Sequence, residues 1–108
     1  MVIRLNSVPE KLFIIGYIGS DRIGAGEKVA NLLGYELLIL DDLIVEKDGR
    51  TLKKIIMSMG EHEYRNKEYE ILEEYSRKKN FVMVCGDGII LDDMCIAILK
   101  DNPTLFVD

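Results

Sequence analysis

A glycine-bearing segment at residues 16–24 has the composition of a loop that binds phosphate groups. It reads Gly-Tyr-Ile-Gly-Ser-Asp-Arg-Ile-Gly and lies between an apolar run and a helical pattern. In phosphate-binding loops, glycines let backbone N–H groups surround the phosphates, and a lysine and a Mg²⁺-binding hydroxyl follow. The candidate nucleotide-binding residues are Gly16, Gly19, Ser20, Asp21, Arg22, Ile23 and Gly24. The alternative is a strand-to-helix turn that no longer binds a triphosphate but still offers a small-anion site at the helix N-terminus.

Further polar residues follow two other apolar runs. Asp41 and Asp42 come directly after the run at 36–40, and Gly-Asp-Gly at 86–88 follows the run at 81–85. Asp41 and Asp42 could bind a substrate or a metal ion, and the guanidinium of Arg65 could bind a carboxylate with two hydrogen bonds.

Each of these residues also has a purely structural interpretation. Asp41 and Asp42 could cap a short helix, because aspartate is favoured at helix N-termini. Arg65 could pair with Glu61 or Glu68, which lie four residues before it and three after it on the same helix. The aspartate between the two glycines at 86–88 is typical of a turn.

The apolar runs alternate with helical patterns, which predicts a sheet of parallel strands with helices on both faces. Strands are expected at residues 11–16, 36–40, 81–85 and 104–107, and helices at 27–33, 42–46, 51–57, 61–79 and 92–99. Gly60 is expected to break the helical pattern, and Thr51 to cap the segment before it. In such sheets ligands bind beyond the carboxyl ends of the strands, where the polar segments fall.

At the level of the whole chain, the sequence resembles the shikimate kinase family. The resemblance starts with LFIIGYIGS, which parallels the family's first strand and G-x-x-G-S loop, and it covers most of residues 11–108. It is strongest in GRT at 49–51 and GEHEYR at 60–65, where the family carries G-[RMK]-[ST] and G-E-x-x-F-R at the same spacing. It ends with VCGDG at 84–88, where the family has three glycines after a buried strand.

The resemblance implies a fold and a set of roles. The fold would be a P-loop, nucleoside-monophosphate-kinase-like three-layer sandwich, with a four-stranded parallel sheet in the order 2-3-1-4 and without the family's lid and last strand. Asp41 would bind the shikimate hydroxyls and help activate the attacking one. Arg65 would bind the shikimate carboxylate, and Gly86, Asp87 and Gly88 would stand where three glycines contact the substrate. ATP and Mg²⁺ would be the cofactors of an active enzyme.

The sequence departs from the family pattern mainly on the phosphate side. Arg22 stands in for the lysine, Ile23 replaces the hydroxyl, and Ile39 replaces an aspartate that supports the metal. Asp21 adds a negative charge that would face the phosphates, and Asp87 adds one near the substrate carboxylate. Since phosphoryl transfer depends on positioning and charge neutralisation, these changes predict a very weak or absent kinase.

Two functions from different classes follow. The first is a shikimate-kinase-like protein that is catalytically weak or inactive and retains part of the small-anion acceptor site. The alternative is an active shikimate kinase that transfers the γ-phosphoryl group of ATP to the shikimate 3-hydroxyl, with Asp41 and Arg22 as catalytic residues.

Composition limits the partners. The 108 residues predict a single domain, 1–108, and the net charge of −5 with a pI of about 4.9 argues against nucleic-acid and anionic-membrane partners. No secretory signal is visible, and Cys85 and Cys95 lack metal-ligand spacing, so a cytoplasmic protein without a metal site is expected. The predicted last strand has no covering helix after it, so a second copy of the chain is expected to cover that edge.

Overall fold

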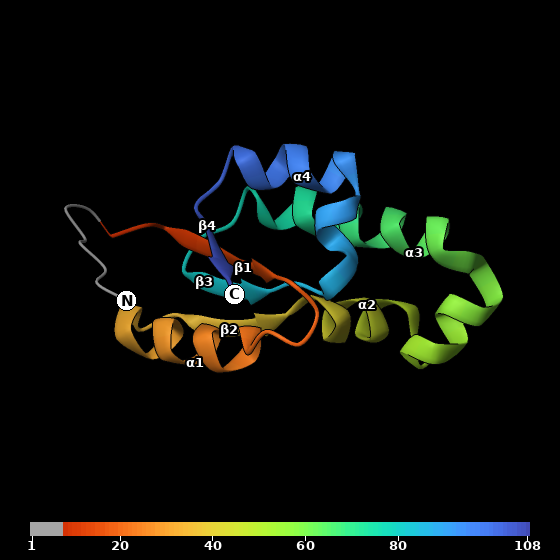
Figure 1. The fold of residues 1–108 in the computed structure, drawn as a ribbon, viewed down its shortest axis with the longest axis horizontal. Helices are drawn as coiled ribbons and strands as arrows, with labels where there is room; N and C mark the ends of the chain where they lie inside the picture. The colour runs from red at the N-terminus through yellow and green to blue at the C-terminus, as the bar shows by residue number, and fades with distance from the viewer. Residues whose placement is uncertain (1–7) are drawn as a thin grey trace.

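The computed structural model describes residues 8–108, in which one or two helices separate each strand from the next. The elements are β1 (Lys11–Gly16), α1 (Arg22–Leu33), β2 (Glu36–Ile39), α2 (Leu40–Asp48), α3 (Leu52–Tyr75), β3 (Phe81–Val84), the 3₁₀ helix η1 (Asp87–Leu91), α4 (Asp93–Lys100) and β4 (Thr104–Val107). Figure 1 shows α1 on one side of the sheet, and α4 with the end of α3 on the other.

The described strands form one parallel sheet in the order β2-β3-β1-β4. In register, Phe13 of β1 lies beside Met83 of β3 on one side and Thr104 of β4 on the other. Strand β2 pairs only with β3, and β4 only with β1, so these two strands are the edges. This arrangement confirms the predicted three-layer fold and strand order.

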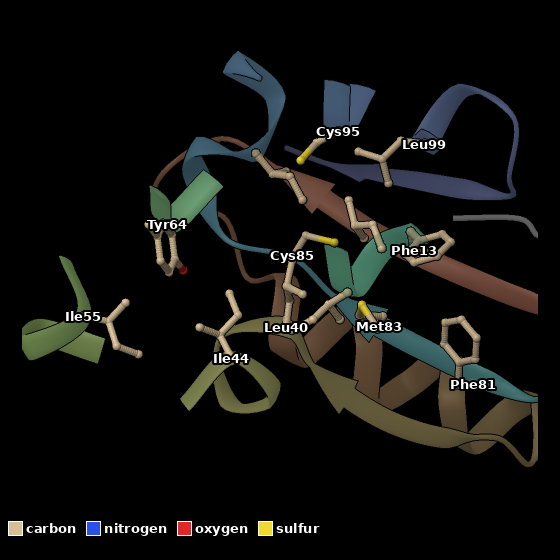
Figure 2. Close-up of a cluster of buried hydrophobic side chains, with 13 residues drawn as sticks. Phe13, Leu40, Ile44, Ile55, Tyr64, Phe81, Met83, Cys85, Cys95 and Leu99 are labelled. Carbon is tan, nitrogen blue, oxygen red and sulfur yellow. The ribbon is translucent and has the colours of Figure 1, made fainter. Parts of the chain in front are cut away.

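Alternate side chains of the strands fill two cores, one on each face of the sheet. On the face of α1, Ile14 and Val84 pack against Val29. The larger core lies on the other face, where Phe13 and Met83 meet residues from α2, α3, η1 and α4 (Figure 2). Cys85 and Cys95 are buried here as free thiols, as expected for small core residues.

Helix α1 begins at Arg22, five residues earlier than the predicted start at residue 27. The prediction was wrong because it places the glycines at 24 and 26 in the loop. Gly26 lies instead where the helix crosses the sheet, and a Cβ atom there would come within 2.6 Å of Val84 Cγ2 and 3.2 Å of Leu37 Cδ1. A glycine is therefore required by close packing rather than by a turn.

This contact predicts that Gly26→Ala destabilises the fold. Alanine favours a helix by about 1 kcal/mol over glycine, but the overlap with β3 must displace packed side chains. We expect a net loss of about 1–3 kcal/mol in the free energy of unfolding, measured by urea denaturation. Asn31→Ala, at an exposed site of the same helix, is the control. A Gly26→Ala protein as stable as the wild type would contradict the packing argument.

Thr51 caps α3, as predicted, because its side chain accepts a hydrogen bond from the amide of Lys54. The two predicted helices around Gly60 run on as one element with a kink, where Gly60 adopts φ 80° and ψ 171°. Only glycine adopts this conformation readily. The helix ends at Tyr75, four residues before the predicted end at 79, and the 3₁₀ helix after β3 was not predicted.

Within residues 8–108, no helix is both long and apolar enough to cross a membrane.

Candidate functional site

The predicted site residues gather beyond the carboxyl ends of β1, β2 and β3. Because these strands are parallel neighbours, the loop after β1, the first turn of α2 and the turn after β3 end at the same edge of the sheet. Arg65 reaches this edge from α3, just beyond the kink at Gly60. The structure thus brings together segments that are far apart in the sequence.

Asp21 closes the N-terminus of α1. Its side chain accepts a hydrogen bond of 3.0 Å from the amide of Gly24, as a helix cap does. The carboxylate lies so close to Gly24 that a Cβ atom there would be 2.2 Å from Asp21 Oδ2. A negative group thus occupies the helix N-terminus, which in a phosphate-binding loop faces the phosphates.

Arg22 binds the loop itself and the neighbouring turn. Its Nη1 donates to the backbone oxygens of Gly16 at 3.0 Å and Tyr17 at 2.9 Å, and its Nη2 donates to Asp87 Oδ1 at 2.8 Å. The Arg22 side chain is only 13% exposed. The Arg22–Asp87 pair therefore links the loop after β1 to the turn after β3, and each side chain offsets the charge of the other.

The remaining loop residues do not form a polyphosphate site as they stand. The Ser20 hydroxyl donates to the Tyr17 oxygen at 2.7 Å, and Ile23, at the place of a metal-binding hydroxyl, is an exposed hydrocarbon. Among residues 8–108, no group of three or more His, Cys, Asp or Glu side chains is placed to hold a metal ion. With Arg22, Ile23 and Ile39 in the places of the lysine, the hydroxyl and the metal-supporting aspartate, these side chains do not fit the ATP and Mg²⁺ that the resemblance implies.

The residues predicted to bind the substrate, here called the acceptor side, do surround a cavity, in contrast to the loop after β1. A cavity of about 260 Å³ is bordered by all five predicted substrate-binding residues, together with side chains from α3. The lining residues are Asp41, Leu52, Ile56, Tyr64, Arg65, Glu68, Gly86, Asp87 and Gly88. A smaller cavity of about 90 Å³ shares Asp41, Gly86 and Asp87 with it and extends to Arg22 and Ile23.

Asp41 is held by a neighbour that the sequence did not indicate. The Tyr64 hydroxyl donates a hydrogen bond to Asp41 Oδ1. Burial and the Asp41 carboxylate raise the pKa of Tyr64, so the phenol stays protonated and remains a donor. Neither Asp41 nor Asp42 is the N-cap of α2, which is Ile39, and Asp42 is exposed.

Arg65 makes both of the helix contacts that the sequence allowed. Its Nη1 donates to Glu68 Oε1, and its Nη2 lies 3.4 Å from Glu61 Oε1. The guanidinium also packs on Gly88, where a Cβ atom would lie 1.9 Å from Arg65 Nη2. Any side chain at position 88 would displace Arg65 from the cavity wall.

Glu68 is the site residue that the sequence reasoning missed. Its side chain is fully buried, and its Oε2 has no hydrogen-bond partner among the described residues. Burial raises the pKa of Glu68 to about 7, with further upward effects from Asp41 and Asp92, although Arg65 opposes them. The spacing from Arg65 pointed to this residue as a partner, but only the fold shows that it lies inside.

Comparison with known proteins agrees with the family that the sequence resembles. The family model described as shikimate kinase matches residues 23–108. A shikimate kinase of Chlorobium limicola is 35% identical over 94 residues, which are 87% of this chain and 47% of that protein. One of Prosthecochloris aestuarii is 32% identical over 97 residues, which are 90% of this chain and 49% of that protein.

The structural comparison agrees. Shikimate kinase from Acinetobacter baumannii, solved in complex with shikimate, superposes with a TM-score of 0.86 and 28% identity over 94% of this chain and 56% of that one. The chain thus spans about half the length of the curated relatives that it matches.

Proposed function

Because this chain belongs to the shikimate kinase family, we propose that it is a shikimate-kinase-like protein that binds shikimate or a similar small ligand and transfers phosphate weakly or not at all. The observation that carries this proposal is the contrast between the two halves of the site. Asp41, Arg65 and the turn at 86–88 surround one cavity. The N-terminus of α1, by contrast, is closed by the Asp21 carboxylate, and Arg22 is bound to the loop and to Asp87.

The acceptor roles follow from the chemistry of these residues. Asp41 has one oxygen on Tyr64 and a second that can accept a ligand hydroxyl. Arg65 has five N–H donors and keeps some for a ligand carboxylate beside its two glutamates. Gly86 and Gly88 would contribute backbone N–H groups from the turn after β3.

An active kinase is the second candidate, and one observation favours it. The cavity beside Arg22 shares Asp41 with the larger acceptor cavity, so a cation lies beside the residue expected to orient the attacking hydroxyl. In this reading Arg22 would leave Asp87 and take the role of the missing lysine.

The proposal also concerns the cellular location and the oligomeric state of the protein. We treat residues 1–108 as one domain in the cytoplasm, supported by the single sheet and by the two free thiols. Strand β4 pairs only with β1, and Phe106 of that strand is 43% exposed. These features favour a second copy of the chain at the β4 edge.

An amide chemical-shift titration tests the proposal. Shikimate is added first, and Mg·ATP second, to one isotope-labelled sample. We expect shikimate to shift the amides around Asp41, Arg65 and residues 86–88, and Mg·ATP to leave residues 16–26 unchanged. Shifts in the loop with Mg·ATP, followed by turnover in a coupled assay, would establish the active kinase instead. No shift with shikimate would reject the acceptor-site proposal.

A further inference from the structure

We propose that Tyr64 is a positioning residue of the acceptor cavity, whose hydroxyl holds the Asp41 carboxylate in the orientation that a ligand hydroxyl requires. This inference deepens the proposed function and rests on it, because it concerns how the same cavity recognises its ligand. At this position the shikimate kinase family carries phenylalanine in its G-E-x-x-F-R motif, so the hydroxyl of Tyr64 is an addition to the family pattern.

The ring of Tyr64 is fixed by its surroundings. Tyr64 lies in α3, four residues after the kink at Gly60, and only 6% of it is exposed. The ring belongs to the larger core (Figure 2), and the same side chain borders the acceptor cavity. Because packed cores hold their side chains in single rotamers, the hydroxyl at the end of the ring stays at one place beside the cavity.

The hydroxyl has one partner, which is Asp41. It donates to Asp41 Oδ1, and this is the only hydrogen bond of the Tyr64 side chain among residues 8–108. Burial and the Asp41 carboxylate raise the pKa of Tyr64, so the hydroxyl keeps its proton. Hydrogen bonds to a carboxylate are stronger than those between neutral groups. The bond therefore restricts the rotation of the carboxylate and leaves Oδ2 for a ligand.

The surroundings of Gly86 show where the held carboxylate lies. A Cβ atom built on Gly86 would be 3.7 Å from each Asp41 oxygen and 3.7 Å from Glu68 Oε2. All three residues border the acceptor cavity. A ligand hydroxyl on the open side of Gly86 would thus meet an Asp41 oxygen that is already oriented, and binding would not have to order the carboxylate.

The ring of Tyr64 contacts the other acceptor group. Arg65 Cζ lies 5.3 Å from the centroid of the ring, which is within the range of a cation–π contact. One side chain therefore touches both the residue expected to orient a ligand hydroxyl and the residue expected to bind a ligand carboxylate. Because the two contacts use different parts of Tyr64, Tyr64→Phe removes the first and keeps the second.

The test compares two ligands that share a ring and a carboxylate. Shikimate and cyclohex-1-ene-1-carboxylate, which lacks the hydroxyls, are titrated separately against the full chain and against Tyr64→Phe by amide chemical shifts. In the variant, binding must also order Asp41, so the affinity for shikimate should fall about threefold to tenfold. The affinity for the hydroxyl-free acid should stay unchanged, because the ring beside Arg65 is retained.

Tyr69→Phe is the matched control. Tyr69 lies on the same helix but borders a different cavity, together with Met94. Loss of its hydroxyl should leave the affinity for both ligands unchanged. Amide spectra without ligand show whether each variant keeps the fold, which we expect for Tyr64→Phe because phenylalanine fills the same place in the core.

The outcomes separate this inference from the proposed function. An affinity for shikimate that is unchanged or raised in Tyr64→Phe overturns the inference, and so does an equal loss for both ligands, which would indicate a structural role. If the hydroxyl-free acid shifts no amide, a loss of shikimate affinity in Tyr64→Phe but not in Tyr69→Phe supports the inference. No shift of the wild-type chain with either ligand rejects the proposed function, and the inference with it.

Discussion

The triple variant Asp21→Gly, Arg22→Lys, Ile23→Ser is expected to bind Mg·ATP at least tenfold more tightly than the wild-type chain. Removing the Asp21 carboxylate releases the Gly24 amide and takes a negative charge away from the N-terminus of α1. Lysine and serine restore the point charge and the hydroxyl that phosphate-binding loops use. The affinity is measured by calorimetry and by amide shifts at residues 16–26.

A second variant separates charge from geometry. Asp21→Asn keeps an acceptor for the Gly24 amide but removes the charge, so it should give a smaller gain in affinity than the triple variant. Asp42→Asn, at an exposed aspartate in the first turn of α2, removes the same charge away from the loop and should give none. If the triple variant folds, as judged by its amide spectrum, and still does not bind Mg·ATP, the backbone of the loop rather than its side chains prevents binding.

Glu68→Gln is expected to flatten the dependence of stability on pH. The pKa of Glu68 is raised from 4.5 to about 7 by burial, against the effect of Arg65 and together with those of Asp41 and Asp92. Between pH 4.5 and 7 the folded chain holds a proton that the unfolded chain has released, so the free energy of unfolding falls as pH rises. A shift of this size corresponds to about 3 kcal/mol across the window.

The experiment is a set of urea denaturations at pH 5, 6, 7 and 8. The difference between Glu68→Gln and the wild type should move by about 2–3 kcal/mol in favour of the variant from pH 5 to pH 8. The same substitution at Glu70, an exposed position of α3, is the matched control and should leave the pH dependence unchanged. Parallel curves for Glu68→Gln and the wild type would show that Glu68 does not titrate in this range.

The triple variant changes the phosphate side of the site, and Glu68→Gln changes the acceptor side. The polar groups of these two sides differ in whether they have partners within the chain. On the phosphate side, side chains of the loop and the neighbouring turn satisfy one another through the Asp21 cap and the Arg22–Asp87 pair. On the acceptor side, Glu68 Oε2 has no partner among the described residues, and the cavity beside it is open to a ligand. The proposed function requires an acceptor site that is open to a ligand and a phosphate loop whose polar groups are bonded to one another.

The sequence by itself determined the order of the strands and helices and the edge at which the polar segments meet, whereas the strand order in the sheet came from the resemblance to the shikimate kinase family. These features could be predicted because buried parallel strands appear as short apolar runs, and because ligand sites in such sheets lie at the carboxyl ends. The cap at Thr51 and the break at Gly60 were also visible, since both depend on local backbone preferences.

Only the tertiary structure decided what the polar side chains contact. The need for glycine at position 26 within α1 depends on its close approach to Val84, which lies on a strand more than fifty residues away. Two side-chain pairs also join elements that are far apart in the sequence: Arg22 with Asp87, and Tyr64 with Asp41. Periodicity along one chain carries no information on such distant partners, and so the burial of Glu68 could not be inferred from its spacing to Arg65 alone.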